Sequence, residues 1–178
     1  MKRTTLIIAL GLIASVTFAQ KKTTTSASVN FDATTPADAM PKAENKTVVA
    51  AIDTKTGTVA FEAVVKSFSF GNPMMQEHFN GAKWMDSEKF PKATFKGTIT
   101  NLAEVNFAAD GSYKASVEGE LTMHGVTKPV KTTADITVAG GAVTSKSDFT
   151  IVGADYGIGD AGGKVAKEPK ISVVAEFK

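Results

Sequence analysis

The sequence has 178 residues, of which 43% are hydrophobic and none is cysteine. Lys and Arg number 20 against 18 Asp and Glu, and without Lys2 and Arg3 at the N-terminus the two totals are equal at 18. This balance, with no Arg after Arg3, argues against recognition of nucleic acid or of strongly anionic membranes, because both depend on excess cationic charge. Without disulfides one hydrophobic core must supply the stability, and the length suffices for one such domain.

The N-terminus has the features of a secretory signal peptide. Lys2 and Arg3 form a basic start, residues 6–16 are almost wholly apolar, and Thr17 and Ala19 are small residues at the positions that a signal peptidase reads. The apolar run is shorter than the roughly 20 residues of a membrane span. We therefore predict a signal peptide over residues 1–19, no stable membrane insertion after its cleavage, and a periplasmic or secreted location.

Residues 20–45 are read as a polar lead-in followed by a loop. The first part is Lys, Thr and Ser, which predicts a mobile segment, although residues 28–31 could begin a strand. Residues 34–45 contain two prolines and few large side chains, which favours a loop with at most one helical turn. Regular structure is expected to start at Lys46, so that residues 46–178 form a single β domain.

Two strands are predicted next, over residues 47–53 and 58–70, joined by a tight turn at residues 54–57. Within the second strand the apolar alternation changes phase, because Phe61 and Phe68 fall on opposite parities. A β-bulge or bend near Val64 would place both on the concave side of the sheet.

One short helix follows. Asn72 is a good N-cap, Pro73 suits the first helical position, and Gly81 ends the segment. The residues after it, which include Trp84 and several charges, predict an irregular or helical segment lying over an apolar opening.

The remaining chain reads as strands over residues 93–107, 142–152 and 170–177, with a β-hairpin between the first two. The hairpin is centred on residues 121–130 (LTMHGVTKPV), where Gly125 suits the turn. Apolar and polar residues alternate strictly on both sides of this turn, so one face is buried and the other is solvated.

The predicted fold class is all-β. Seven or eight short antiparallel strands with Gly-rich turns form either a sandwich or an up-and-down barrel. We favour the barrel, because closure removes the strand edges that a disulfide-free exported sheet would expose.

The predicted interior is unusually rich in small residues, such as Ala63, Gly97, Gly119 and Ala134. A barrel of about eight strands can be packed solid or can hold one small ligand. Small residues could merely fit the taper of a solid barrel, but we favour a cavity. The expected ligand-binding positions are the aromatic and methionine residues at Phe61, Phe68, Phe70, Met75, Phe79, Trp84, Phe95, Met123 and Phe149.

Motifs for catalysis or cofactor binding are weak. Residues 157–162 match GxGxxG, but no helix long enough to receive a pyrophosphate follows, so we expect a flexible loop. His78 and His124 have no metal-site spacing, and His124 is expected to be a turn residue that bonds to the backbone. We predict no catalytic residues and no metal. The alternatives are a metal-dependent enzyme or stress protein that uses His78, Glu77 and His124, or a solid-cored structural or interaction module.

Four segments together resemble the YceI-like family. They are residues 75–80 (MQEHFN), 85–95 (MDSEKFPKATF), 119–130 (GELTMHGVTKPV) and 155–158 (DYGI), and their order and spacing also agree. The resemblance implies a lipocalin-like antiparallel barrel of eight strands with a short helical excursion. It also implies a bacterial periplasmic or secreted protein that binds polyisoprenoid or other long apolar chains in an elongated cavity.

The function expected from the sequence is therefore that of an exported, non-enzymatic carrier or binding protein. Its ligand would be an isoprenoid, quinone, polyprenol or fatty acyl chain, held by burial of apolar surface. No cofactor is expected other than an isoprenoid quinone or lipid bound as ligand, and no nucleic acid partner. A homodimer is left open.

Overall fold

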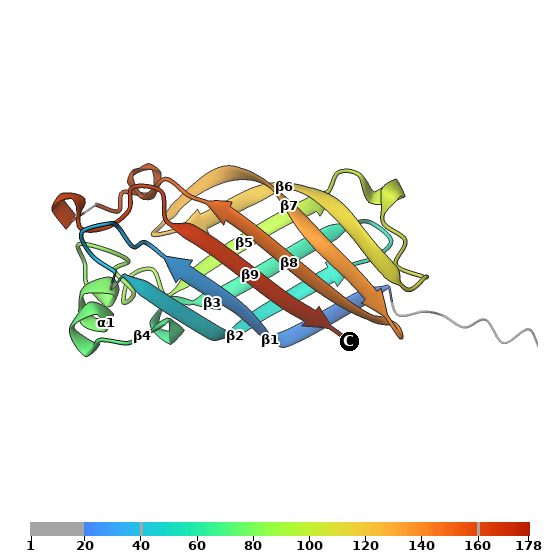
Figure 1. Cartoon of the computed structure of the whole chain (residues 1–178), viewed down its shortest axis with the longest axis horizontal. Coiled ribbons are helices and arrows are strands. Elements are labelled where there is room, and N and C mark those ends of the chain that lie inside the picture. Colours follow the sequence, from blue (N-terminus) through green and yellow to red (C-terminus); the bar gives the residue numbers. More distant parts are fainter. Residues whose placement is uncertain (1–19, 40, 160) are drawn as a thin grey trace, which may run out of the picture.

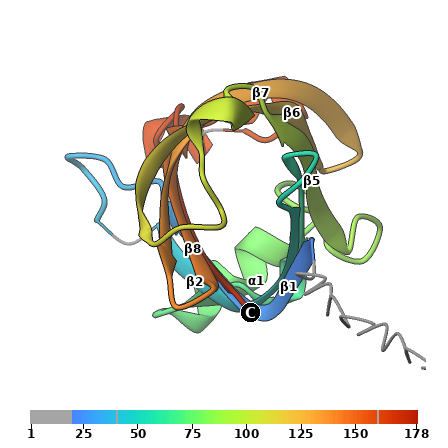
Figure 2. The same ribbon diagram turned by 90° about the vertical axis from the view of Figure 1, so that its right-hand side faces the viewer.

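The computed structural model describes residues 20–39, 41–159 and 161–178, so the predicted signal peptide of residues 1–19 lies outside the described residues. Eight strands close an antiparallel barrel in which β9 pairs with β1 to complete the ring (Figures 1 and 2). This confirms the predicted fold class. Within the described part of the chain, no helix is long and apolar enough to cross a membrane. The barrel strands are β1 (Lys21–Asp32), β2 (Lys42–Asp53), β3 (Thr58–Val64), β5 (Lys92–Ile99), β6 (Gly111–Met123), β7 (Val126–Ala139), β8 (Ala142–Thr150) and β9 (Lys170–Phe177).

The mobile lead-in predicted after residue 20 is wrong, because β1 begins at Lys21. The loop predicted over residues 34–45 is present between β1 and β2, but it is shorter than predicted because β2 begins at Lys42 rather than near Lys46. Strand β1 pairs with β2 along its length, whereas its pairing with β9 begins only at Ser28. Its first half is consequently polar, rich in the β-branched Thr that strands accommodate well. Only Ala27, Val29 and Phe31 carry the apolar alternation, which is too short a signal to stand out in a Lys- and Thr-rich run.

The phase change after β3 comes from a bend, one of the two predicted alternatives, and not from a β-bulge. A 3-10 turn over Val65–Ser67 ends the strand, and Val65, which is fully buried, donates its N–H to the Pro91 carbonyl at 2.9 Å. The two-residue strand β4 (Ser69–Phe70) then pairs with β2 outside the barrel ring. Phe68 still reaches the interior, as predicted, but by a turn rather than by an extra residue in the ladder.

The strand predicted over residues 93–107 ends early, because β5 stops at Ile99 and a 3-10 turn over Leu102–Glu104 follows. Asn101 holds this corner: its Oδ1 accepts the N–H of Ser116 at 2.7 Å, and its Nδ2 donates to the Lys114 carbonyl at 3.0 Å. Strand β8 likewise ends at Thr150, two residues before the predicted boundary.

Helix α1 (Pro73–Asn80) is confirmed at both ends. Asn72 Oδ1 accepts the N–H of Met74 at 2.9 Å, Pro73 is the first helical residue, and Gly81 follows the last. The buried Phe79 side chain anchors α1 across one end of the barrel (Figure 1). Its ring centroid lies 6.0, 5.7 and 4.9 Å from those of Phe31, Phe68 and Phe70.

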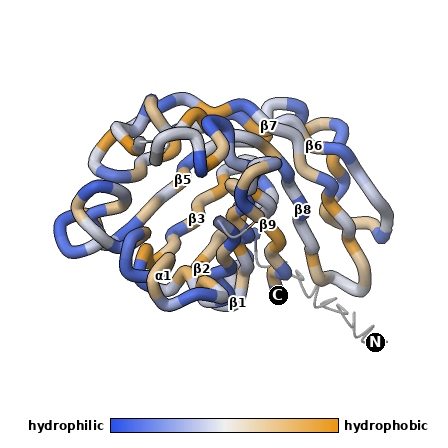
Figure 3. Tube along the Cα trace, turned by 60° about the vertical axis from the view of Figure 1, so that its left-hand side comes forward, coloured by the Kyte–Doolittle hydropathy of each residue, from blue (hydrophilic) through white to orange (hydrophobic). Residues whose placement is uncertain are grey.

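The β6–β7 hairpin is also confirmed. His124 and Gly125 have φ angles of 51° and 75° in a two-residue turn closed by the Met123–Val126 pair. Positive φ at both positions is the type I′ geometry that matches the twist of the flanking strands. Hydrophobic and hydrophilic residues alternate along the barrel strands (Figure 3), which puts one face of each inside.

The interior is solid in one half of the barrel. At the end opposite α1, the side chains of Ile52, Val138, Val143 and Phe177 are almost completely buried. Phe177 also meets Phe61 edge-on, with ring centroids 6.4 Å apart. This packed half provides the core, and any open interior space lies toward α1.

Gly97 and Gly119 do not open interior space as the sequence suggested. They are directly paired on β5 and β6, and the Phe95 ring lies over both. A Cβ on Gly119 would lie 2.4 Å from the Lys96 carbonyl oxygen and 2.6 Å from the Phe95 ring. These glycines therefore allow close backbone approach and seat an aromatic ring.

Replacing Gly119 by Ala should destabilise the barrel by about 1–3 kcal/mol, because backbone atoms must move to admit the methyl group. Gly71→Ala is the matched control, since a Cβ there would have no atom within 4 Å. Urea unfolding of both variants tests this. Equal stability of the two variants would contradict the close packing described at Gly119.

Candidate functional site

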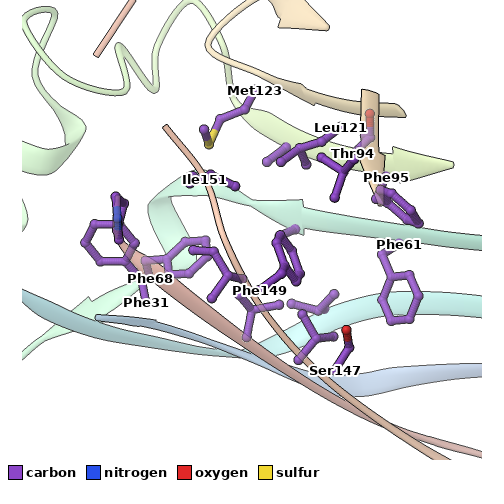
Figure 4. Close-up of a pocket in the computed structure, with 18 of the residues that line it drawn as sticks. Phe31, Phe61, Phe68, Thr94, Phe95, Leu121, Met123, Ser147, Phe149 and Ile151 are labelled. Carbon is purple, nitrogen blue, oxygen red and sulfur yellow. The ribbon is translucent and has the colours of Figure 1, made fainter. Parts of the chain in front are cut away.

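The α1 end of the barrel contains a cavity of about 180 Å³. Side chains from each of the eight barrel strands line it, and Figure 4 shows several of them. Residues of α1, of the segment after α1 and of the loop after β8 complete the lining. Strand residues on its wall include Val29, Val48, Phe61, Phe95, Val117, Leu121, Val130, Phe149 and Ile171, and residues near its cover include Phe79, Trp84, Met85, Ile151, Ile158 and Val165.

Most of the residues predicted to bind ligand lie on this wall. They are Phe61, Phe68, Phe79, Trp84, Phe95, Met123 and Phe149. Phe70 and Met75 are not among the lining residues: the Phe70 ring packs against the Phe79 ring at a tilt of 50°, and Met75 is half-buried on α1. That the wall residues contact a ligand stays a prediction.

The lining is uncharged. Among the described residues it contains no Asp, Glu, Lys, Arg or His, and its polar side chains are Trp84, Thr94, Thr132, Ser145 and Ser147. The ion pairs lie on the outer face of the barrel instead, as between Lys131 and Glu118 at 3.0 Å and between Lys114 and Asp135 at 2.9 Å. Because a buried charge without a partner is costly, this cavity favours apolar, uncharged occupants.

Comparison with known proteins agrees with this architecture. The family model of the YceI-like domain matches residues 13–177. The chain belongs to the YceI-like family. A UPF0312 protein of Pseudomonas fluorescens is 43% identical over 54 residues, and one of Vibrio parahaemolyticus is 36% identical over 64 residues. These matches cover 30% and 36% of this chain but only 26% and 30% of the relatives.

Solved structures share the YceI-like barrel over nearly the whole chain. A polyisoprenoid binding domain from Saccharophagus degradans aligns with a TM-score of 0.75 at 13% identity, covering 89% of this chain and 98% of that one. A Campylobacter jejuni YceI protein aligns with a TM-score of 0.58 at 16% identity, covering 100% and 99%. Burkholderia cenocepacia BcnA gives 0.55 at 20%, covering 90% and 97%. Identities this low show the fold alone.

Several wall residues of this YceI-like barrel were missed by sequence reasoning. Val29 and Phe31 fall in residues 28–31, where the sequence allows a strand to begin but does not place it in the barrel wall. Ile158, Val165 and Pro169 belong to the segment after β8, whose glycines suggest only a loop. No hydrophobic periodicity in the sequence identifies these loop residues, because their position depends on how the loop folds back over the barrel.

The loop after β8 lies beside β7, in a region where β7 and β8 are no longer paired. The β7–β8 ladder ends at the Ala134–Ser147 pair, although β7 continues back to Val126. A 3-10 turn over Gly153–Tyr156 lies beside β7. The loop therefore forms part of the cavity wall.

His124 fastens this loop to the hairpin. Its Nδ1 lies 2.8 Å from the Tyr156 carbonyl oxygen, and because a carbonyl can only accept, Nδ1 carries the hydrogen and donates. The imidazole also meets the Phe90 ring edge-on, with centroids 5.0 Å apart. Burial raises the pKa of the Tyr156 phenol above its ordinary value, and the nearby Asp155 charge adds to this. The prediction that His124 bonds to the backbone at a turn is confirmed.

The predicted GxGxxG segment lies in the same loop, with Asp160 outside the described residues. Gly157 adopts a φ of 72° at the end of the 3-10 turn, and the helical piece that follows, Ala161–Gly163, is only three residues long. The described part thus lacks the long helix whose N-terminus would receive a pyrophosphate.

The alternative metal site is not assembled in the described part of the chain, where no three His, Cys, Asp or Glu side chains come close enough to hold a metal ion. His78 is exposed on α1, whereas His124 is engaged at the hairpin turn. Asn45, the first residue of an Asn-Lys-Thr sequon, is fully buried and its Nδ2 donates to the Val64 carbonyl at 3.0 Å. Its amide is structural and inaccessible to glycosylation.

Replacing His124 by Asn should loosen the loop while preserving the turn, because Asn tolerates positive φ but does not carry the imidazole. Hydrogen exchange of the Gly153–Tyr156 turn should become about fivefold faster, the equivalent of one lost hydrogen bond. His78→Asn on the exposed face of α1 is the control. Unchanged exchange in the His124 variant would show that this contact does not hold the loop.

Proposed function

We propose that this YceI-like protein is an exported, non-enzymatic carrier that holds one long apolar molecule inside its barrel. The observation that carries the proposal is the uncharged cavity, to which every barrel strand contributes an apolar side chain. Burial of a few hundred Å² of ligand at about 25 cal/mol per Å² gives several kcal/mol, before the cost of ordering the ligand.

The comparisons support a long-chain ligand. The Saccharophagus degradans domain of the same fold is described as polyisoprenoid binding. By this likeness, an isoprenoid, isoprenoid quinone, polyprenol or fatty acyl chain is the proposed ligand class. The signal-like N-terminus and membership of the YceI-like family support export to the periplasm or beyond.

The cavity also separates this proposal from its rivals. A solid-cored module would have no interior space, whereas about 180 Å³ remains open here beside the packed residues around Phe177. An enzyme using both histidines would need them at one site, yet His124 is committed to the Tyr156 carbonyl.

The chain has one tryptophan, Trp84, and it lies on the cavity wall, so its fluorescence reports occupancy. Titration of the mature protein with a polyprenol and with hexadecane should give saturable changes. Ala134→Leu should weaken binding about tenfold, because displacing about two methylenes from the cavity costs about 1.6 kcal/mol.

Thr137→Leu, on the solvated face of the same strand, is the control and should bind as the wild type does. Both variants should remain folded, as judged by thermal unfolding. Absence of any saturable change, or equal affinities in the two variants, would contradict the proposed carrier.

A further inference from the structure

Three hydroxyl side chains form the main polar feature of the cavity wall. Thr132 on β7 and Ser145 and Ser147 on β8 occupy inward positions, and we refer to them as the hydroxyl cluster. Ser145 pairs with Ile136, and Ser147 pairs with Ala134 at the last rung before β7 and β8 separate. The cluster therefore sits where the two strands begin to part.

The hydroxyl cluster lies at the inner end of the cavity. In Figure 4, Ser147 is on the same side as Phe61, and Phe31 and Phe68 are on the opposite side. Phe61 contacts Phe177 of the packed half, whereas Phe31 and Phe68 contact Phe79 of α1. A molecule that fills the cavity from the α1 end would reach these hydroxyls with its leading end.

The hydrogen bonds of the cluster leave capacity for a ligand. Ser147 Oγ donates to the Thr133 carbonyl at 2.8 Å. Thr132 Oγ1 lies 3.1 Å from Ser147 Oγ and 3.3 Å from the Thr133 carbonyl, so it can donate to either and still accept. The Ser145 hydroxyl makes no hydrogen bond to any described residue, and so one donor and several lone pairs face the cavity.

The apolar and uncharged lining around these hydroxyls limits which chemical groups they can bind. A hydrocarbon that displaced water from the inner end would leave Ser145 buried and unpaired, which is unfavourable. An ionised carboxylate or phosphate would enter a lining without any positive side chain. A neutral group that hydrogen-bonds avoids both penalties.

We infer that the hydroxyl cluster is a subsite for an uncharged hydrogen-bonding group, such as an alcohol or amide, on the leading end of the apolar ligand. This inference rests on the proposed carrier function and narrows its ligand class. The polar end enters the barrel first, and the hydrocarbon chain extends back toward α1.

The test uses the mature protein, Trp84 fluorescence, and four probes with equal chain length: hexadecane, hexadecanol, hexadecanamide and palmitate. Affinities of wild type and Ser145→Ala are compared for each probe, because the ratio cancels differences in aqueous solubility. Thr132→Val removes a second hydroxyl while keeping the side-chain shape. Ser112→Ala, at an exposed position of β6, is the matched control.

Ser145→Ala should weaken the binding of hexadecanol and of hexadecanamide about fivefold to tenfold, which is the usual effect of losing one buried hydrogen bond. Hexadecane should bind at least as tightly to Ser145→Ala as to the wild type, because the variant has no hydroxyl that the hydrocarbon would leave unpaired. Palmitate at neutral pH should bind to the wild type at least about tenfold more weakly than hexadecanol does. The unfolding transition should not shift, because Ser145 loses no internal hydrogen bond.

Three results would overturn the subsite while leaving the carrier in place. They are an equal loss of affinity for hexadecane and hexadecanol in Ser145→Ala, no loss of affinity for either probe, and tighter binding of palmitate than of any other probe. Failure of all four probes to bind would overturn the carrier and the subsite together.

Discussion

Closure of the eight-stranded ladder is the constraint on which the rest of this structure depends. The ring is complete only because β1 pairs with both β2 and β9. Once closed, eight strands fix an interior that side chains can fill or leave partly open. Here Phe177 and its neighbours fill the half opposite α1, and the remaining space becomes the cavity.

One half of the barrel provides the packed core, and the other half contains the cavity. The packed half supplies the core that a chain without cysteine requires. At the other end the wall is assembled from elements with less regular pairing, namely α1, the separated ends of β7 and β8, and the loop tied down by His124. Local opening is expected to be least costly at this end of the barrel, which would give the proposed ligand a route into the cavity.

Sequence patterns predicted the parts that rest on local chemistry. The Asn72 cap with Pro73 located α1, and the His124–Gly125 turn located the longest hairpin. Seven of the nine proposed ligand positions lie on the cavity wall. Period-two alternation accounts for the four on strands, Phe61, Phe95, Met123 and Phe149, because it fixes which face of a strand points inward.

What could not be predicted depends on long-range pairing. Strand β1 is polar where it has only one neighbour, so its alternation is faint. The small size of Gly97 and Gly119 suggested empty space, but that space is taken by the Phe95 ring and by close backbone contact. The hydroxyl cluster was invisible as a group because its members approach one another only where β7 and β8 part.

The central claim is that this barrel carries a long, uncharged apolar molecule. Native mass spectrometry of the protein purified gently from its own host, followed by organic extraction of the same sample, tests this most directly. We expect a mass above that of the mature chain and an extracted neutral lipid that accounts for the difference. A protein that is always empty, or whose extract contains only an ionic metabolite, would contradict the claim.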